Sequence, residues 1–157
     1  MPRSQPHGPI RFHVEETFRA PIGYSFRWCT SYSPQDPSIE KDDYVRRVLT
    51  RSPRRVVFQD LGRAERGWFL NQQTVTLHPP GHWHAESRGT YRDWSIDYRL
   101  HPLPDGRTRF TFDGLRRATP LAEVVPTRPE VDANLRQLWG RFGRALERDY
   151  RRSRRRR

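Results

Sequence analysis

The segment EVDANLRQLWGRFGRALERDYRR, residues 130–152, has the longest helical pattern in the chain. Its apolar residues recur every three or four positions and so form one stripe along a helix; they are Val131, Leu135, Leu138, Trp139, Phe142, Ala145 and Leu146. Thr127 and Glu130 form a T-x-x-E capping box at its start, and Pro129 fits the first turn. A long amphipathic helix needs a large apolar surface elsewhere in the chain on which to pack.

Before this helix, much of the chain alternates apolar and polar residues, which is the period-two pattern of half-buried β-strands. Two short helices are expected after the first strand, around 24–32 and 33–38. Short turns separate the later strands, including one at 61–66, so neighbouring strands are expected to be antiparallel. The predicted strands span residues 10–18, 43–51, 54–61, 67–78, 82–90, 94–102 and 107–115.

The turns at 79–81 and 104–106 fix the expected pairing of the strands that they join. The expected pairs are Leu77–Trp83, Val75–Ala85, Gln73–Ser87, Leu100–Phe110 and Tyr98–Phe112, with Ile96 near Ser87 and Tyr98 near Ala85. Alternate residues then form one apolar face that matches the apolar stripe of the helix, as in an α+β fold. This face comprises Phe69, Val75, Leu77, Trp83, Ala85, Trp94, Ile96, Tyr98, Leu100, Phe110 and Phe112.

The composition favours a single folded domain, because five Trp, six Tyr and eight Phe among 157 residues suffice for a core. The net charge of +12 is typical of nucleic-acid or acidic-membrane binding, but six of the 30 basic residues lie in 151–157. We expect a disordered N-terminus at 1–8, one domain at 9–152 and a disordered Arg-rich tail at 153–157. The single Cys29 excludes an internal disulfide. No apolar run reaches the length of a membrane span, so we expect a cytoplasmic monomer or homodimer.

The order of these elements resembles that of the SRPBCC or START-like superfamily, which includes birch-pollen-allergen-like and polyketide cyclase/dehydrase-type proteins. The resemblance is carried by IRFHVEETF at 10–18 followed by Ala20-Pro21, by LHPPG at 77–81, by LHPLPDGRT at 100–108 and by the terminal helix. It covers about residues 9–152. It implies a helix-grip fold, in which a seven-stranded antiparallel curved sheet wraps around a long C-terminal helix. It also implies a largely apolar cavity that binds a hydrophobic small molecule, with catalysis in some members only.

The resemblance places such a ligand between the inward face of the sheet and the terminal helix. The side chains expected there are Arg47, Phe58, Asp60, Phe69, Asn71, Gln73, Trp83, Ser87, Trp94, Tyr98, Phe112, Leu135, Trp139 and Phe142. Two interpretations of the charged members remain open: Arg47 and Asp60 pair with each other, or they orient oxygen atoms of a ligand. Two interpretations also remain open for the aromatic members: they pack in the hydrophobic core, or they contact a planar ligand. Which face of the strands in 43–61 points inward decides between the two interpretations of Arg47 and Asp60. A slip of one residue in the register would invert this face.

Acid–base chemistry inside such a cavity has three candidate residues, Asp60, Tyr98 and Glu16. The sequence has no nucleophile-elbow, Walker or dinucleotide-binding motif, so no cofactor is expected. The histidines of 78–84 share one strand face, which suits zinc, but that face is the solvated one. We therefore expect no metal site.

Three functions are compatible with these features. The first is binding of an apolar, aromatic or polyketide- or lipid-like molecule between sheet and helix. The second is an enzyme of the polyketide cyclase or aromatase type that uses the same cavity without a metal or nucleotide cofactor. The third is a basic nucleic-acid-associated protein that uses the residues 151–157, although a solvated chain end explains the same charges.

Overall fold

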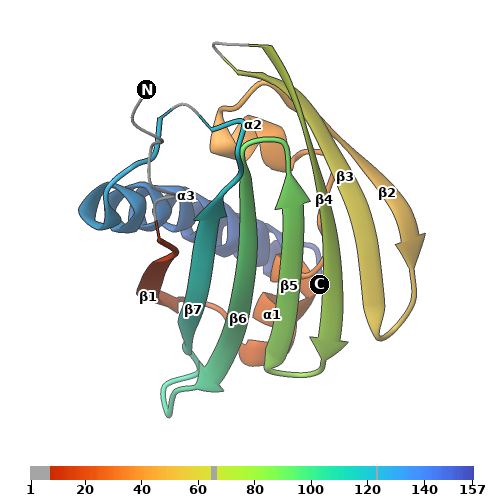
Figure 1. The fold of residues 1–157 in the computed structure, drawn as a ribbon. Helices are drawn as coiled ribbons and strands as arrows, with labels where there is room; N and C mark the ends of the chain where they lie inside the picture. Colours follow the sequence, from red (N-terminus) through yellow and green to blue (C-terminus); the bar gives the residue numbers. More distant parts are fainter. Residues whose placement is uncertain (1–7, 65–66, 123) are drawn as a thin grey trace, which may run out of the picture.

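Seven antiparallel strands form one curved sheet that wraps around the last helix (Figure 1). The computed structural model describes residues 8–64, 67–122 and 124–157. In chain order the elements are β1 (Ile10–Phe18), α1 (Ile22–Cys29), α2 (Asp36–Glu40), β2 (Tyr44–Arg51), β3 (Arg55–Ala64), β4 (Gly67–His78), β5 (His82–Gly89), β6 (Arg92–Pro102), β7 (Thr108–Ala118) and α3 (Arg128–Arg155). The strand order is β1-β7-β6-β5-β4-β3-β2. The predicted α+β helix-grip architecture is therefore confirmed, with its two short helices between the first two strands.

The turns on either side of the central strands set their register as predicted. The observed pairs include Gln73–Ser87, Val75–Ala85, Leu77–Trp83, Tyr98–Phe112 and Leu100–Phe110. The predicted register between β5 and β6 was wrong by two residues, because β6 begins earlier than expected, at Arg92. Ile96 therefore pairs with Ala85, and Tyr98 pairs with Trp83. A shift of two residues keeps each side chain on its face, so the apolar inner face is as predicted.

Strand β2 faces the opposite way from the prediction. Arg46, rather than Arg47, pairs with Asp60 and points inward, whereas Arg47 is exposed. A bulge directly after Val48 breaks the alternation along the strand. Leu49, whose apolar side chain suggested the inward parity, lies on the outer face with Val45 and Arg47 and is 40% exposed.

The turn predicted at 61–66 was also wrong over its first half, because β3 continues to Ala64 and pairs with β4. Gly62 suggested a turn, but it lies inside the sheet, directly opposite Phe69. The Phe69 ring lies so close to the Gly62 backbone that a Cβ there would be 2.5 Å from its Cζ atom. Glycine thus marks a close approach in the sheet here rather than a chain reversal.

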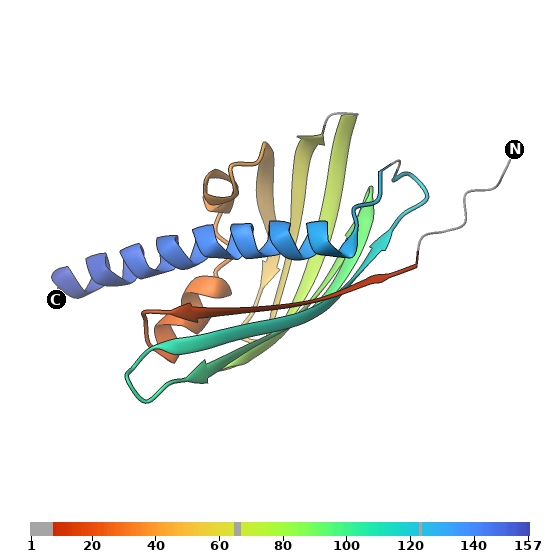
Figure 2. The ribbon, with the colours of Figure 1, turned by 90° about the vertical axis from the view of Figure 1, so that its left-hand side faces the viewer.

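Helix α3 lies along the concave face of the sheet and projects past it at its C-terminal end (Figure 2). The predicted capping box is present: Thr127 Oγ1 accepts from the Glu130 N–H, and the Glu130 carboxylate accepts from the Thr127 N–H. The helix continues to Arg155, so the tail predicted as disordered at 153–157 is helical as far as that residue. Residues 1–7 of the predicted disordered N-terminus lie outside the described residues. Within the described ranges, no helix is both long enough and apolar enough to cross a membrane.

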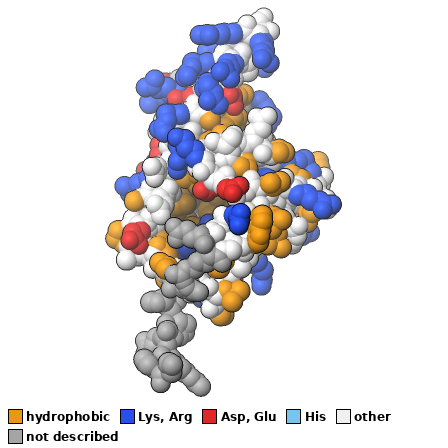
Figure 3. Space-filling view, turned by 90° about the horizontal axis from the view of Figure 1, so that it is seen from above, with side chains coloured by type: hydrophobic (Ala, Val, Ile, Leu, Met, Phe, Trp, Pro, Cys, Tyr) orange, Lys and Arg blue, Asp and Glu red, His pale blue; other side chains and the backbone are white. Residues whose placement is uncertain are grey.

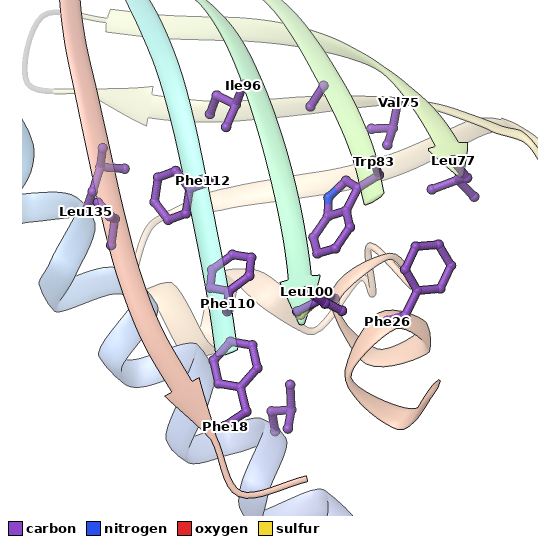
Figure 4. Close-up of a cluster of buried hydrophobic side chains, with 14 of the residues drawn as sticks. Phe18, Phe26, Val75, Leu77, Trp83, Ile96, Leu100, Phe110, Phe112 and Leu135 are labelled. Carbon is purple, nitrogen blue, oxygen red and sulfur yellow. The ribbon is translucent and has the colours of Figure 1, made fainter. Parts of the chain in front are cut away.

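Aromatic side chains fill the space between α3 and the strands at one end of the sheet (Figure 4). Phe18, Trp83, Phe110 and Phe112, which we call the aromatic core, are at most 1% exposed. The Phe110 ring lies 4.5 Å from the Trp139 ring of α3, measured between ring centroids. Burial of a large apolar side chain stabilises a fold by about 1.5–3 kcal/mol. These contacts hold α3 against the sheet.

Candidate ligand-binding cavity

A cavity of about 180 Å³ lies between the inner face of the sheet, α3 and the short helices. Its lining combines aromatic and aliphatic side chains with several charged ones. The lining residues are Trp28, Cys29, Tyr32, Asp36, Glu40, Arg46, Asp60, Asn71, Gln73, Trp83, Ala85, Ser87, Arg92, Trp94, Ile96, Tyr98, Leu135, Leu138, Trp139 and Phe142. An apolar recess with a few polar groups is the usual composition of a small-molecule site.

Stacked aromatic rings form one wall of the cavity. The rings of Trp83 and Tyr98 lie 4.9 Å apart and are inclined by only 10°. The strand register causes this stacking, because the two residues are directly opposed on β5 and β6. Trp139 extends the wall from α3, with its ring centroid 5.9 Å from that of Tyr98. Flat, polarisable faces of this kind suit planar apolar ligands.

The cavity lining also carries charged groups that we call the polar wall: Asp36, Glu40, Arg46 and Asp60. The Arg46 side chain is only 5% exposed, and its Nε and Nη2 atoms donate to the two carboxylate oxygens of Asp60 at 2.8 and 2.9 Å. Its Nη1 atom donates to Asp36 Oδ2, and its guanidinium carbon lies 4.4 Å from the centre of the Phe58 ring. Two carboxylates and an aromatic face thus replace the water that burial removes from the guanidinium.

Two carboxyl groups of the polar wall titrate close to neutral pH. Burial raises the pKa of Asp36 to about 6 and the pKa of Glu40 to about 7, although the positive charge of Arg46 opposes both shifts. Burial also raises the pKa of the Tyr98 hydroxyl and of the Cys29 thiol. The cavity therefore presents neutral hydroxyl and thiol groups beside carboxyl groups that exchange protons near pH 7.

Most of the residues that the sequence assigned to a ligand surround this one cavity. Those that line it are Asp60, Asn71, Gln73, Trp83, Ser87, Trp94, Tyr98, Leu135, Trp139 and Phe142. Phe58 and Phe112 are fully buried outside the lining. Phe69 packs against the β3 backbone, and Arg47 points to solvent because β2 has the opposite facing.

Two of the three candidate catalytic residues, Asp60 and Tyr98, line the cavity. Both Asp60 oxygens accept hydrogen bonds from Arg46, so this carboxylate acts as an ion-pair partner. Glu16 lies on β1 beside charged side chains of α3, among them Arg136, and does not line the cavity. Its position removes it from the candidates for chemistry in this space.

The charged side chains Asp36, Glu40, Arg46 and Arg92 line the cavity but were missed in the sequence. A signal for Arg46 was present, since strict alternation places it on the same face as the apolar Val48. Asp36 and Glu40 lie in the short helix α2, whose position above the sheet depends on tertiary packing. No local pattern encodes that position.

The histidines weighed as a metal site form a hydrogen-bonded network on the outer face of the sheet. His82 and His84 both bond to Asp97, at 3.1 and 3.0 Å, and His84 also bonds to Glu86 at 2.6 Å. The His78 ring stacks on that of His82. Among the described residues, no group of three or more His, Cys, Asp or Glu side chains is arranged to hold a metal ion.

A curved antiparallel sheet that grips one long helix around an aromatic-lined cavity defines the helix-grip fold of START-like proteins. Solved structures show this fold at low sequence identity. Ara h 8.0201 is 10% identical, with a TM-score of 0.68 over 88% of this chain and 98% of that chain. The Zhui aromatase/cyclase from Streptomyces sp. R1128 is 13% identical, with a TM-score of 0.66 over 92% of this chain and 95% of that chain.

A START superfamily protein from Mycobacterium smegmatis is 14% identical, with a TM-score of 0.58 over 89% of this chain and 97% of that chain. No family model matches the sequence, and no curated protein matches it either. The structural likenesses confirm the predicted SRPBCC or START-like resemblance at the level of the fold.

Proposed function

We propose that this protein binds a hydrophobic small molecule, with an aromatic or polyketide-like ring system, in the cavity between the sheet and α3. One observation carries this proposal: a space of about 180 Å³ is lined by stacked aromatic rings together with charged and amide side chains. A core that existed only for stability would fill such a space, because empty volume destabilises a fold. The likeness to an aromatase/cyclase and to a START superfamily protein supports the same function.

Two kinds of side chain in the lining contact different parts of the ligand. Trp83, Tyr98 and Trp139 contact the apolar rings of the ligand. Asn71 and Gln73, from neighbouring inward positions of β4, supply amide donors and acceptors for its oxygen atoms. Polar groups at fixed positions in an apolar recess give orientation and specificity rather than bulk affinity.

The test is a fluorescence titration with N-phenyl-1-naphthylamine, a neutral probe with a naphthalene and a phenyl ring, whose emission rises in apolar surroundings. Ser87 is buried and lines the cavity, so Ser87→Leu places three extra carbon atoms in the binding space. We expect this variant to bind the probe at least about ten-fold more weakly, a loss of about 1.4 kcal/mol. The matched control is Arg88→Leu, which puts the same leucine side chain at the next residue of β5, which faces solvent.

The control variant is expected to bind the probe like the wild type. Equal binding by wild type and Ser87→Leu, with Ser87→Leu shown to be folded by near-ultraviolet circular dichroism, contradicts the proposal. Mass spectrometry of a solvent extract from natively purified protein then identifies any ligand that the cavity carries.

An enzyme of the cyclase or aromatase type is the second candidate, and the polar wall favours it. General acid–base catalysts work best with a pKa near the operating pH, and burial raises the pKa of Glu40 to about 7. In an aldol cyclisation, a carboxylate removes a proton from carbon, the enolate carbon attacks a ketone carbonyl of the same chain to form the ring C–C bond, and a carboxyl group protonates the carbonyl oxygen to a hydroxyl. Removal of a second proton from the same carbon and protonation of that hydroxyl then release water and leave a C=C bond. Incubation with a linear polyketone, followed by mass spectrometry for the loss of water, tests this function. We expect Glu40→Gln to lower that rate while binding of the neutral probe is unchanged.

A further inference from the structure

A second hollow, of about 340 Å³, adjoins the cavity where α2, the start of β6 and the first turns of α3 meet. We call it the vestibule. It shares Glu40, Arg92, Trp94, Leu135 and Leu138 with the cavity, so the two spaces have a common wall. Figure 3 views the molecule from above and shows acidic and basic side chains beside each other near the middle of this face. A molecule too long for the cavity extends into this space.

Two guanidinium groups of the vestibule pack on one indole ring. The guanidinium carbon of Arg92 lies 5.3 Å from the centre of the Trp94 ring, and that of Arg116 lies 5.5 Å from the same ring. The register causes this, because Arg116 is directly opposite Trp94 on β7. Burial, together with the positive charge of Arg92, lowers the pKa of Arg116 to about 10. Arg116 thus stays protonated at pH 7 although its surroundings oppose its charge.

The cationic groups of the vestibule are incompletely paired within the described part of the chain. Nη1 of Arg116 and Nε of Arg141 are both buried and have no hydrogen-bond partner there. Arg141 comes from α3, and both residues line the vestibule. The acidic residues of the vestibule, Glu40 and Asp42, act electrostatically on Arg92. A buried donor without a partner costs about 1–3 kcal/mol, so these donors are positioned for an acceptor from outside the chain.

We propose that the vestibule binds the anionic group of an amphipathic ligand, a carboxylate, sulfonate or phosphate, whose apolar rings lie in the adjoining cavity. Arg116 and Arg141 provide the hydrogen bonds from opposite sides, one from β7 and one from α3. Guanidinium groups match such anions in geometry and charge. This inference rests on the proposed function, because it places the ligand's apolar part in the same cavity.

Two fluorescent probes separate the two proposals. 8-Anilino-1-naphthalenesulfonate has the ring system of N-phenyl-1-naphthylamine and adds one sulfonate group. We expect the wild type to bind the sulfonate probe about ten-fold more tightly than the neutral one. We expect Arg116→Gln and Arg141→Gln each to weaken sulfonate binding by about ten-fold and to change binding of the neutral probe by less than about two-fold.

The matched controls are Arg117→Gln and Arg144→Gln, exposed arginines of the same strand and helix that do not line the vestibule. They are expected to bind both probes like the wild type. Affinity for the sulfonate should also fall when salt rises from about 50 mM to about 500 mM, because salt screens the charges.

Each other outcome overturns a particular statement. If both probes bind the wild type and neither Arg116→Gln nor Arg141→Gln weakens the sulfonate selectively, the anion site is wrong and the cavity proposal stands. If neither probe binds the wild type, the proposed function fails and the anion site fails with it. Equal losses in the Arg117→Gln or Arg144→Gln controls would show a general effect of net charge and would also contradict the site.

Discussion

The aromatic core and the polar wall meet at the cavity, which is lined by Trp83 of the first and by all four residues of the second, yet they pack in different ways. In the aromatic core, rings from the sheet contact each other and α3 at centroid distances such as 5.1 Å for Phe18 and Phe110. In the polar wall, Arg46 is held by Asp36 and Asp60, and the group cannot collapse further without losing these partners. Apolar rings stabilise a fold most when they pack without voids. A buried charged group is stable only while its ion-pair partners stay within hydrogen-bonding distance. The cavity lies at the border between these two kinds of packing.

The largest expected effect tests the aromatic core. Phe110 is fully buried and contacts Trp83, Tyr98, Phe112 and Trp139. Replacing it with Ala removes these contacts and leaves a void, so we expect Phe110→Ala to lower the free energy of unfolding by about 4 kcal/mol. Urea unfolding followed by tryptophan fluorescence measures the change.

The matched control on the same strand is Arg117→Ala, an exposed position where we expect a change within about 0.5 kcal/mol. A loss of about 1 kcal/mol or less for Phe110→Ala would mean that these rings do not hold the helix and that the contrast between the two regions is wrong.

The next effect tests the polar wall. Arg46→Ala leaves the carboxylates of Asp60 and Asp36 buried without their cation, and we expect a loss of about 3 kcal/mol. The matched control is Arg47→Ala, the neighbouring arginine that points to solvent, with an expected change within about 0.5 kcal/mol. The same unfolding assay distinguishes them. Equal effects of the two substitutions would contradict the observed facing of β2.

The same pair of arginines shows which parts of the molecule a sequence can predict. Across 79–81 and 104–106, short turns fix the register, and the apolar alternation on both sides is unbroken, so the predicted pairing of β4 with β5 and of β6 with β7 was correct. In β2 both candidate faces carry an arginine and apolar side chains, with Arg46 and Val48 on one face and Arg47 and Leu49 on the other. Alternation then gives two consistent solutions, and the contact with Asp60 that decides between them is not local.

The candidate site follows the same rule. Its aromatic residues on β5, β6 and α3 could be predicted, because strand and helix periods place them on inner faces. Asp60 could be predicted in the same way, but Glu40 and Arg92 could not, since they belong to a short helix and to a strand end whose positions depend on packing across the fold. The vestibule was missed for this reason, because α2, β6, β7 and α3 each contribute to it.

A smaller effect concerns the pH dependence of the polar wall. Burial raises the pKa of Glu40 to about 7 from an ordinary value of 4.5. The folded state therefore binds this proton more tightly, and the stability that it contributes is complete below pH 4.5 and is lost as pH rises through 7. The Glu40→Gln variant has no carboxyl group at this position, so it does not lose this stability. The free energy of unfolding of Glu40→Gln minus that of the wild type should therefore rise by about 2 kcal/mol from pH 4.5 to pH 7.

The control for this measurement is Glu86→Gln, on the outer face of the sheet. For this residue we expect a pH dependence of stability of the opposite sign. Partial burial raises the pKa of Glu86, but hydrogen bonds from His84 and Ser95 outweigh it and hold the pKa below its ordinary value. The stability that the Glu86 carboxylate contributes to the wild type is therefore lost as the pH falls, not as the pH rises. Urea unfolding at a series of pH values separates the two variants. Parallel pH curves for wild type and Glu40→Gln would show that folding does not shift the pKa of Glu40.

The smallest expected effect lies outside both regions, at the end of α3. None of the residues 151–157 lines the cavity or the vestibule, although Arg154 packs over the Tyr150 ring at 5.9 Å. Removing 151–157 should therefore change the affinity for the neutral naphthylamine probe by less than about two-fold, or 0.4 kcal/mol. A loss of salt-dependent binding to DNA or RNA on the same truncation, measured by fluorescence anisotropy, would instead favour the nucleic-acid function. Because the same truncated protein is used in both titrations, the result decides whether the arginine-rich end or the cavity carries the binding activity.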